Sequence, residues 1–120
     1  MFYIDQRSPL SIYEQILRNI EKLIVSGALL KNEKLPSVRS LANDLAVNPN
    51  TIQKAYALLE ERGIIYSQAG RGSFVAIDRG EFQEKYLPRE LQVLDRAVDA
   101  LLALHMTKEE IIAHIDGYCE

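Results

Sequence analysis

The side chains best suited to chemistry in this sequence are hydrogen-bonding groups that match the edges of DNA bases. They lie close together, at Asn48, Asn50, Thr51, Gln53 and Lys54. Asn and Gln can pair bidentately with adenine, Thr can contact a thymine methyl, and Lys can bind guanine or phosphate. These residue types indicate the first turns of a helix that enters the major groove, where Asn48 could also serve only as the helix cap.

The hydrophobic pattern predicts two consecutive helices around these side chains. Asn48-Pro49 joins a capping side chain to a proline at the first helical position, and Gly63 is a natural stop. Ser37 can cap an earlier helix that continues to about Ala46, and the short connection between the two suits a helix-turn-helix. The expected buried positions are Val38, Leu41, Ala42 and Leu45, followed by Ile52, Ala55, Tyr56 and Leu59.

A helix that precedes this pair is expected to supply much of the core. Its apolar residues recur at three- and four-residue spacing, at Ile12, Ile16, Ile20, Leu23 and Ile24. The helix starts either at Ser8-Pro9 or at a capping box of Ser11 with Glu14, and it ends at Gly27. Gln15 falls off the apolar stripe, which places it on the surface or at the rim of the core.

Two short strands, at residues 64–66 and 73–77, are predicted to form a hairpin after the third helix. The turn between them contains Gly70-Arg71-Gly72. Glycine accepts the positive φ angles of a tight tip, so Arg71 should project outward. The fold class is therefore mainly α with a small β-hairpin: a winged helix-turn-helix domain at residues 1–77.

Residues 78–120 are expected to form a linker and a helical dimerisation tail. The polar stretch from Asp78 to Lys85 is the predicted linker, and Thr107 with Glu110 forms a capping box for the last helix. Between them, apolar residues alternate at three- and four-residue steps to form a seam of Leu91, Leu94, Val98 and Leu101. Since so small a hairpin has few apolar residues of its own, the seam should close against a second copy of the chain.

Composition narrows the function further. Residues 1–77 carry nine Lys and Arg against seven Asp and Glu, whereas residues 78–120 carry five against ten. This division suits phosphate binding by the first part and a protein partner for the second. No apolar run approaches the roughly 18 residues of a membrane span, and the first residues lack the features of a signal peptide, which predicts a cytoplasmic protein.

No set of residues suggests catalysis. An enzyme needs a nucleophile, a base and stabilising groups that converge, and the two histidines, His105 and His114, are placed as packed or exposed side chains. The single cysteine, Cys119, has no partner for a disulfide and no spaced partners for zinc. We therefore expect no enzymatic activity, no cofactor and no metal.

The motifs of residues 9–75 resemble those of the GntR family of bacterial transcription regulators. They occur in the family's order, as Tyr13-Glu14-Gln15-Ile16, Leu35-Pro36-Ser37-Val38-Arg39, Leu41-Ala42, Asn48-Pro49-Asn50-Thr51, Leu59-Glu60, Gly63-Ile64-Ile65 and Gly70-Arg71-Gly72-Ser73-Phe74-Val75. The short two-helix tail and the Asn-Pro-Asn-Thr start of the third helix are similar to the YtrA subfamily, whose tails serve dimerisation.

The resemblance implies roles for individual residues. Arg39 matches a position that contacts DNA, and its forked donors suit phosphate or guanine, with a surface salt bridge as the alternative. Ser37 and the amides near it suit a phosphate at a helix N-terminus, and Ser37 can be a cap as well. Arg71, with Gly70 and Gly72, matches the wing tip that follows the minor groove or backbone. Relatives that respond to fatty acids often have arginines within the stretch that starts the third helix, whereas this chain has Pro49 and Gln53 there, so its operator sequence cannot be inferred from theirs.

These observations predict a sequence-specific DNA-binding transcription regulator, most simply a homodimeric repressor that binds a palindromic operator in double-stranded DNA. The alternative is a winged-helix adaptor that binds proteins and not DNA. The operator sequence, the regulated genes, activation rather than repression, and the identity of any small-molecule effector do not follow from the sequence.

Overall fold

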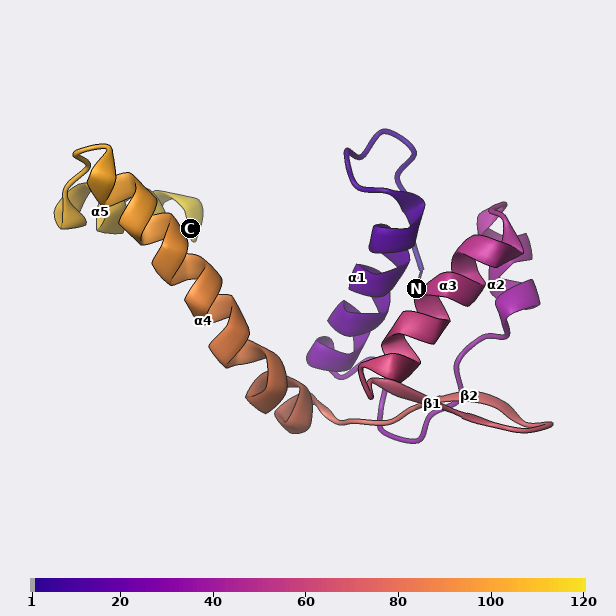
Figure 1. The fold of residues 1–120 in the computed structure, drawn as a ribbon. Helices are drawn as coiled ribbons and strands as arrows, with labels where there is room; N and C mark the ends of the chain where they lie inside the picture. The colour runs from indigo at the N-terminus through magenta and orange to yellow at the C-terminus, as the bar shows by residue number, and fades with distance from the viewer. Residues whose placement is uncertain (1) are drawn as a thin grey trace. The chain divides into compact units, whose positions relative to one another are not determined.

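The computed structural model describes residues 2–120, and within them the chain forms five helices and one two-stranded antiparallel sheet (Figure 1). The chain folds as two compact units, one that ends at Gln83 and one from Glu84 to Glu120. The first unit contains three helices and the hairpin, and the second is helical. The fold is mostly helical, as the pattern predicts.

Helix α1 (Ile12–Ser26) begins at the capping residue Ser11, whose Oγ accepts a hydrogen bond from the amide of Glu14 at 3.1 Å. Of the two predicted starts, the structure therefore has the later one. The helix ends at Gly27, where a φ of 83° places the residue in the left-handed region that glycine adopts without steric cost. The middle of the apolar stripe of α1 is buried, with Ile16 and Ile20 fully inaccessible to solvent, and Ile12 and Leu23 are half-buried.

The surface position expected for Gln15 is wrong. Gln15 is buried, and its side-chain amide pairs with the backbone of the segment before α1. Its Oε1 accepts from the amide of Asp5 at 2.7 Å, and its Nε2 donates to the carbonyls of Asp5 and Leu10, each at 3.0 Å. A buried amide side chain is tolerated because every one of these polar groups has a partner. Periodicity alone does not detect such a backbone partner.

Helices α2 (Val38–Leu45) and α3 (Pro49–Glu61) form the expected pair. Ala46 ends α2 in the left-handed conformation, and the amide of Val47 donates to the carbonyl of Ala42 at 3.0 Å. Asn48 then caps α3. The connection is thus only three residues long, from 46 to 48, which holds the two helices at a tight turn typical of a helix-turn-helix.

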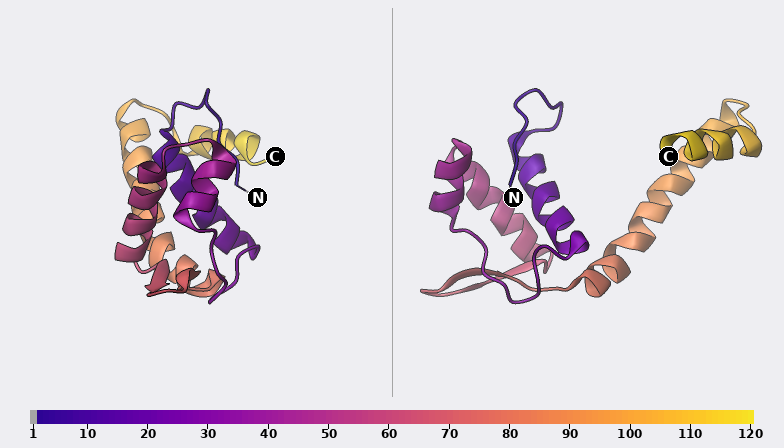
Figure 2. Two further views of the ribbon diagram at one scale, coloured as in Figure 1. Left: turned by 90° about the vertical axis from the view of Figure 1, so that its right-hand side faces the viewer. Right: turned by 180° about the vertical axis from the view of Figure 1, so that it is seen from behind.

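Helix α3 is the central element of the first unit, because it packs against α1, α2 and β1. Figure 1 and Figure 2 show α1, α2 and α3 gathered on one side of the hairpin. The side chains that fill the space between them are almost completely inaccessible, and the largest are Ile16, Ile20, Ile24, Leu41, Ile52, Leu59, Ile64, Ile65 and Val75. Burial of this apolar surface is the main force that holds α3 in place.

Strands β1 (Ile65–Gln68) and β2 (Gly72–Val75) form the hairpin, with Ile65 opposite Val75 and Gln68 opposite Gly72. Sequence reasoning missed a third strand-like segment on the other side of β2. Lys34 forms a bridge with Phe74, and the amide of Leu35 donates to the carbonyl of Ser73 at 2.8 Å. The hairpin is therefore attached to the chain just before α2, and its position depends on that attachment.

Tyr56 joins α3 to the start of α2. Its ring is buried, and its hydroxyl donates to the carbonyl of Pro36 at 2.7 Å. Burial raises the pKa of Tyr56 above its usual range, so the hydroxyl keeps its proton at neutral pH and remains a donor. The bond crosses the helix-turn-helix and ties its two helices together at a point away from the turn.

The boundary between the two units, after Gln83, lies within the predicted linker at residues 78–85, but this segment is helical and not an irregular linker, because helix α4 (Arg79–Ala103) runs through it. Asp78 caps the helix: its Oδ1 accepts a hydrogen bond from the amide of Glu81 at 2.8 Å, and Oε1 of Glu81 accepts one from the amide of Asp78 at 3.4 Å. The hydrogen bond from the Glu81 amide lowers the pKa of the Asp78 carboxyl group, because it stabilises the charged form. Phe82 is buried, and Lys31 pairs with Glu81 at 2.8 Å. Polar residues in the first turn of a capped helix look like a linker in sequence.

The second unit consists of the rest of α4 and helix α5 (Lys108–Tyr118). Pro88 lies inside α4 without ending it, at the loss of one backbone hydrogen bond. The capping box of Thr107 and Glu110 is present as predicted and lowers the pKa of Glu110. Within residues 2–120 no helix has the length and apolar character to cross a bilayer.

We predict that Tyr56→Phe lowers the free energy of unfolding by about 1–3 kcal/mol, because the carbonyl of Pro36 loses its partner. Urea unfolding followed by circular dichroism measures the change. Tyr66→Phe is the matched control, since the Tyr66 hydroxyl bonds to the side chain of Asn32 at 3.0 Å on the exposed surface. Equal losses in the two variants would contradict a structural role for the Tyr56 bond.

Candidate nucleic-acid interface

The two faces of α3 differ completely in burial. Ile52, Ala55, Tyr56 and Leu59 point into the core, and Asn50, Gln53 and Lys54 are exposed on the opposite side. Because side chains three and four residues apart share a helix face, these three polar groups form one surface. Thr51 is half-buried at its edge. The structure thus brings together most of the residues that the sequence indicated as base-reading groups.

Asn48 caps α3, as its position before Pro49 suggested. Its Oδ1 accepts from the amide of Asn50 at 2.8 Å. A bidentate contact with adenine requires both the oxygen and the nitrogen of an amide side chain. Since the oxygen of Asn48 is occupied by the cap, Asn50 and Gln53 are better placed for that type of contact.

The start of α2 presents a second polar group. Ser37 caps the helix, with its Oγ accepting from the amide of Ser40 at 3.0 Å. Arg39 lies in the first turn and is exposed. A helix N-terminus carries partial positive charge, so an exposed guanidinium beside it favours an anionic ligand such as phosphate.

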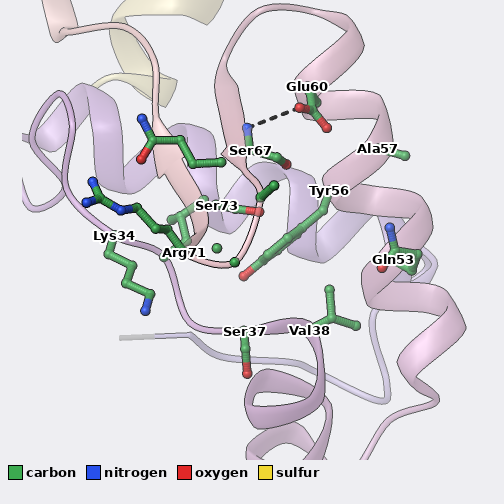
Figure 3. Close-up of a pocket in the computed structure, with 15 residues that line it drawn as sticks. Lys34, Ser37, Val38, Gln53, Tyr56, Ala57, Glu60, Ser67, Arg71 and Ser73 are labelled. Atoms are coloured by element: carbon green, nitrogen blue, oxygen red, sulfur yellow. Dashed lines mark hydrogen bonds between the residues drawn. The ribbon is translucent and has the colours of Figure 1, made fainter.

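A cleft of about 460 Å³ separates α3 from the hairpin. Figure 3 shows Gln53, Ala57 and Glu60 on the α3 side, with Lys34 and Arg71 on the other. Sequence reasoning missed Lys34, Ala57 and Gln68, which also line the cleft. The only sequence signal for a role of Lys34 in the cleft is its position directly before Leu35-Pro36-Ser37. Its approach to the hairpin depends on the bridge to Phe74, which the sequence does not show.

The hairpin tip has the geometry that its glycines predict. The amide of Arg71 donates to the carbonyl of Gln68 at 2.9 Å, and Gly70 and Gly72 have φ angles of 76° and 116°. A Cβ on Gly72 would also lie 3.1 Å from Cε of Lys34. The backbone conformation therefore favours glycine at both positions, and the lack of a side chain at Gly72 also leaves room for Lys34. Arg71 is exposed at the tip.

The charges around this surface are mostly uncompensated cations. Lys34, Arg39, Lys54 and Arg71 are exposed, and none of them has an ion-pair partner in the part of the chain that the structure describes. One carboxylate, that of Glu60, lines the cleft. Unpaired cations beside exposed amides favour a polyanion that offers hydrogen-bond acceptors. Among residues 2–120 there is also no cluster of His, Cys, Asp and Glu that could hold a metal ion.

The sequence of residues 12–75 matches the family described as bacterial regulatory proteins, gntR family. The chain belongs to the GntR family. It is therefore a transcriptional regulator with a GntR-type DNA-binding domain, and the predicted family and winged helix-turn-helix fold are confirmed.

Among its relatives, the HTH-type transcriptional repressor YtrA of Bacillus subtilis is 46% identical over 76 residues. That stretch covers 63% of this chain and 58% of the repressor, so the match spans little more than half of the relative. A GntR family transcriptional regulator from Listeria monocytogenes has a similar structure, with a TM-score of 0.76 and 38% identity, over 95% of this chain and 98% of that one.

A third similar protein has been solved with DNA. The structure of AraR(DBD) in complex with operator ORX1 has a TM-score of 0.55 and 32% identity, and the match covers 62% of this chain and 96% of that chain. Two of these relatives are named as transcriptional regulators and the third is bound to an operator, which indicates a DNA-binding role. Which side chains of this GntR family member touch DNA remains a prediction.

We predict that Arg39→Ala weakens binding to a selected operator by about 1–3 kcal/mol with little change in melting temperature, because the lost group is exposed. A gel-shift titration measures the affinity. Arg18→Ala removes the same charge from the exposed face of α1, outside the cleft, and is the control. If the Arg39 variant binds with unchanged affinity, Arg39 does not contribute to the DNA interface.

For Arg71→Ala we expect a loss that depends on the sequence beside the half-sites. A narrow A·T-rich minor groove attracts arginine, so the loss should be larger on A·T-rich than on G·C-rich flanks. Fluorescence anisotropy with two duplexes that differ only in their flanks measures the difference. Equal losses on the two duplexes would argue for a contact to the backbone alone.

Proposed function

We propose that two copies of this chain bind a palindromic operator and repress transcription by occluding a promoter. The observation that carries the proposal is the exposed face of Asn50, Gln53 and Lys54 beside cations that lack ion-pair partners. Binding to such a surface is favourable mainly for a partner that supplies hydrogen-bond acceptors and negative charge. The adaptor alternative has no comparable observation in its favour.

In the proposed complex, α3 enters the major groove and each polar group has a distinct task. Asn50 and Gln53 read base edges, Lys54 and Thr51 contact bases or phosphate, and Arg39 reaches a phosphate or guanine from α2. The hairpin tip at Gly70-Arg71-Gly72 follows the adjacent minor groove or backbone. The name of the YtrA relative supports repression as the regulatory outcome.

The proposed dimer interface is the apolar seam of the second unit. Leu91 and Leu94 are 49% and 47% exposed, and Val98 and Leu101 are half-buried beside a cavity of about 230 Å³. Residues of α4, of α5 and of the connection between them line this cavity, and all are apolar except His114. Apolar surface left open to water in this way is covered at low cost by an identical surface related by a two-fold axis.

The volume of this cavity is the observation that tests whether the second unit could bind a small-molecule effector. It is smaller than the roughly 300 Å³ at which binding sites for small molecules usually begin. It also lies within the proposed seam. We therefore assign it to apolar side chains of the second copy, and we propose no effector of stated chemistry for the second unit.

A dimer is also what DNA recognition requires. One recognition helix covers too few base pairs for specific affinity, and helix-turn-helix proteins usually pair two half-sites by their own two-fold symmetry. The deciding experiment is selection of bound duplexes from random DNA. Recovery of an inverted repeat, with affinity that falls steeply as salt rises, supports the proposal, whereas failure to enrich any sequence at low salt would leave the adaptor alternative.

We predict that Leu91→Glu combined with Leu94→Glu gives folded monomers in sedimentation equilibrium and weakens operator binding strongly, because like charges then meet in the seam. These leucines are more exposed than Val98 and Leu101, so the packing of α4 against α5 should survive. Gln92→Glu adds a charge to the adjacent exposed position and is the control. A variant that stays dimeric would refute this seam as the interface.

A further inference from the structure

Strand β1 forms an open edge of the small sheet. Ser67 lies opposite Ser73, and the carbonyl of Ser73 already accepts from the amide of Leu35 on the far side of β2. In an antiparallel sheet the N–H and C=O of one residue point to the same side. The pair of Ser67 and Ser73 therefore lacks mutual hydrogen bonds, and the amide of Ser67 points away from β2.

The partner of this edge amide comes from α3. Oε1 of Glu60 accepts from the amide of Ser67 at 3.1 Å, and Figure 3 shows the bond at the end of the cleft. Glu60 is on the same exposed side of α3 as Gln53 and Ala57, since the three follow at three- and four-residue steps. One helix face thus carries both a proposed base-reading group and the group that holds the hairpin.

The placement of Glu60 is unfavourable for DNA binding if its charge is considered alone. Its carboxylate shares the cleft with Lys34 and Arg71, where it reduces the positive potential that attracts phosphate. A negative group in such a position requires a compensating role. The hydrogen bond to Ser67 supplies one, because it links the helix that reads the major groove to the strand that leads into the wing tip.

We propose that Glu60 is a wing-positioning residue: its carboxylate holds the amide of Ser67 and so sets the direction in which the hairpin carries Arg71 toward DNA. The proposal rests on the proposed function, because it assumes that the wing contacts the flanks of an operator. Ser67 and Arg71 belong to the same hairpin, joined through the turn at Gln68. Loss of the hydrogen bond between Glu60 and the Ser67 amide would detach β1 from α3, and the hairpin tip could then adopt more than one orientation.

The test uses the full chain and three variants. Glu60→Ala removes the acceptor and the charge, Glu60→Gln keeps an acceptor oxygen without the charge, and Glu61→Ala removes a charge from the next residue, which lies outside the cleft. Circular dichroism establishes that each variant is folded at the temperature of the binding measurement. Two duplexes share the selected half-sites and differ only in A·T-rich or G·C-rich flanks, and the ratio of the two affinities is the readout.

We expect the flank ratio of Glu60→Ala to fall by about fivefold, the change that corresponds to one net hydrogen bond, and to approach unity. Glu60→Gln and Glu61→Ala should keep the ratio of the unsubstituted chain. General destabilisation would not lower the flank ratio, because a variant that is folded during the measurement and keeps its wing in place still distinguishes the two flanks, even when its melting temperature is lower. Hydrogen exchange of the Ser67 amide should be faster in Glu60→Ala alone.

Two results would overturn the proposal. If the flank ratio of Glu60→Ala is unchanged, Glu60 does not position the wing. If Glu60→Ala and Glu60→Gln both bind the two duplexes more tightly, the residue acts only by repelling phosphate. Failure of the unsubstituted chain to bind any duplex would refute the proposed function instead. The exchange rate of Ser67 needs no DNA, so it reports on the hydrogen bond in either case.

Discussion

The structure of the first unit depends on the burial of one side of α3. Ile52, Ala55, Tyr56 and Leu59 pack against α1, α2 and β1, and this contact sets the rotation of the helix about its axis. With the apolar side fixed inward, Asn50, Gln53 and Lys54 must face outward. A change in the register of this packing would turn these polar side chains, the proposed base-reading groups, into the core, where their unpaired amides would cost free energy.

The surface that α3 presents is completed by residues distant in sequence. Lys34 reaches the cleft through its bridge to β2, Tyr56 ties α3 to the start of α2, and Glu60 holds the edge of β1. These are polar contacts at the margin of an apolar core. They add little to the hydrophobic stabilisation of the unit, but each one fixes the position of an element that contacts DNA in the proposed complex.

The division of charge along the chain corresponds to two kinds of surface. The exposed cations around the cleft and at the starts of α2 and α3 have no carboxylate partner within the described residues, so they are available to an anion; they are Lys34, Arg39, Lys54 and Arg71. The second unit is acidic overall, yet its most exposed large side chains include apolar residues of α4 and α5. The net negative charge of the second unit disfavours contact with DNA phosphates, and its exposed apolar side chains are the kind of surface that the proposed dimer would cover.

The sequence by itself determined the local elements and the exposed face of α3. Caps, prolines, glycines and apolar spacing act within a few residues, and they indicated the three helices, the hairpin tip and the capping box at Thr107. The start of α4 at Arg79 was missed although its cap, Asp78 with Glu81, is local, because a polar first turn resembles a linker in sequence. Only the tertiary structure decided the role of Gln15 and the contacts of Lys34 and Glu60. Each of these depends on a partner that folding brings near, and periodicity carries no information about such a partner.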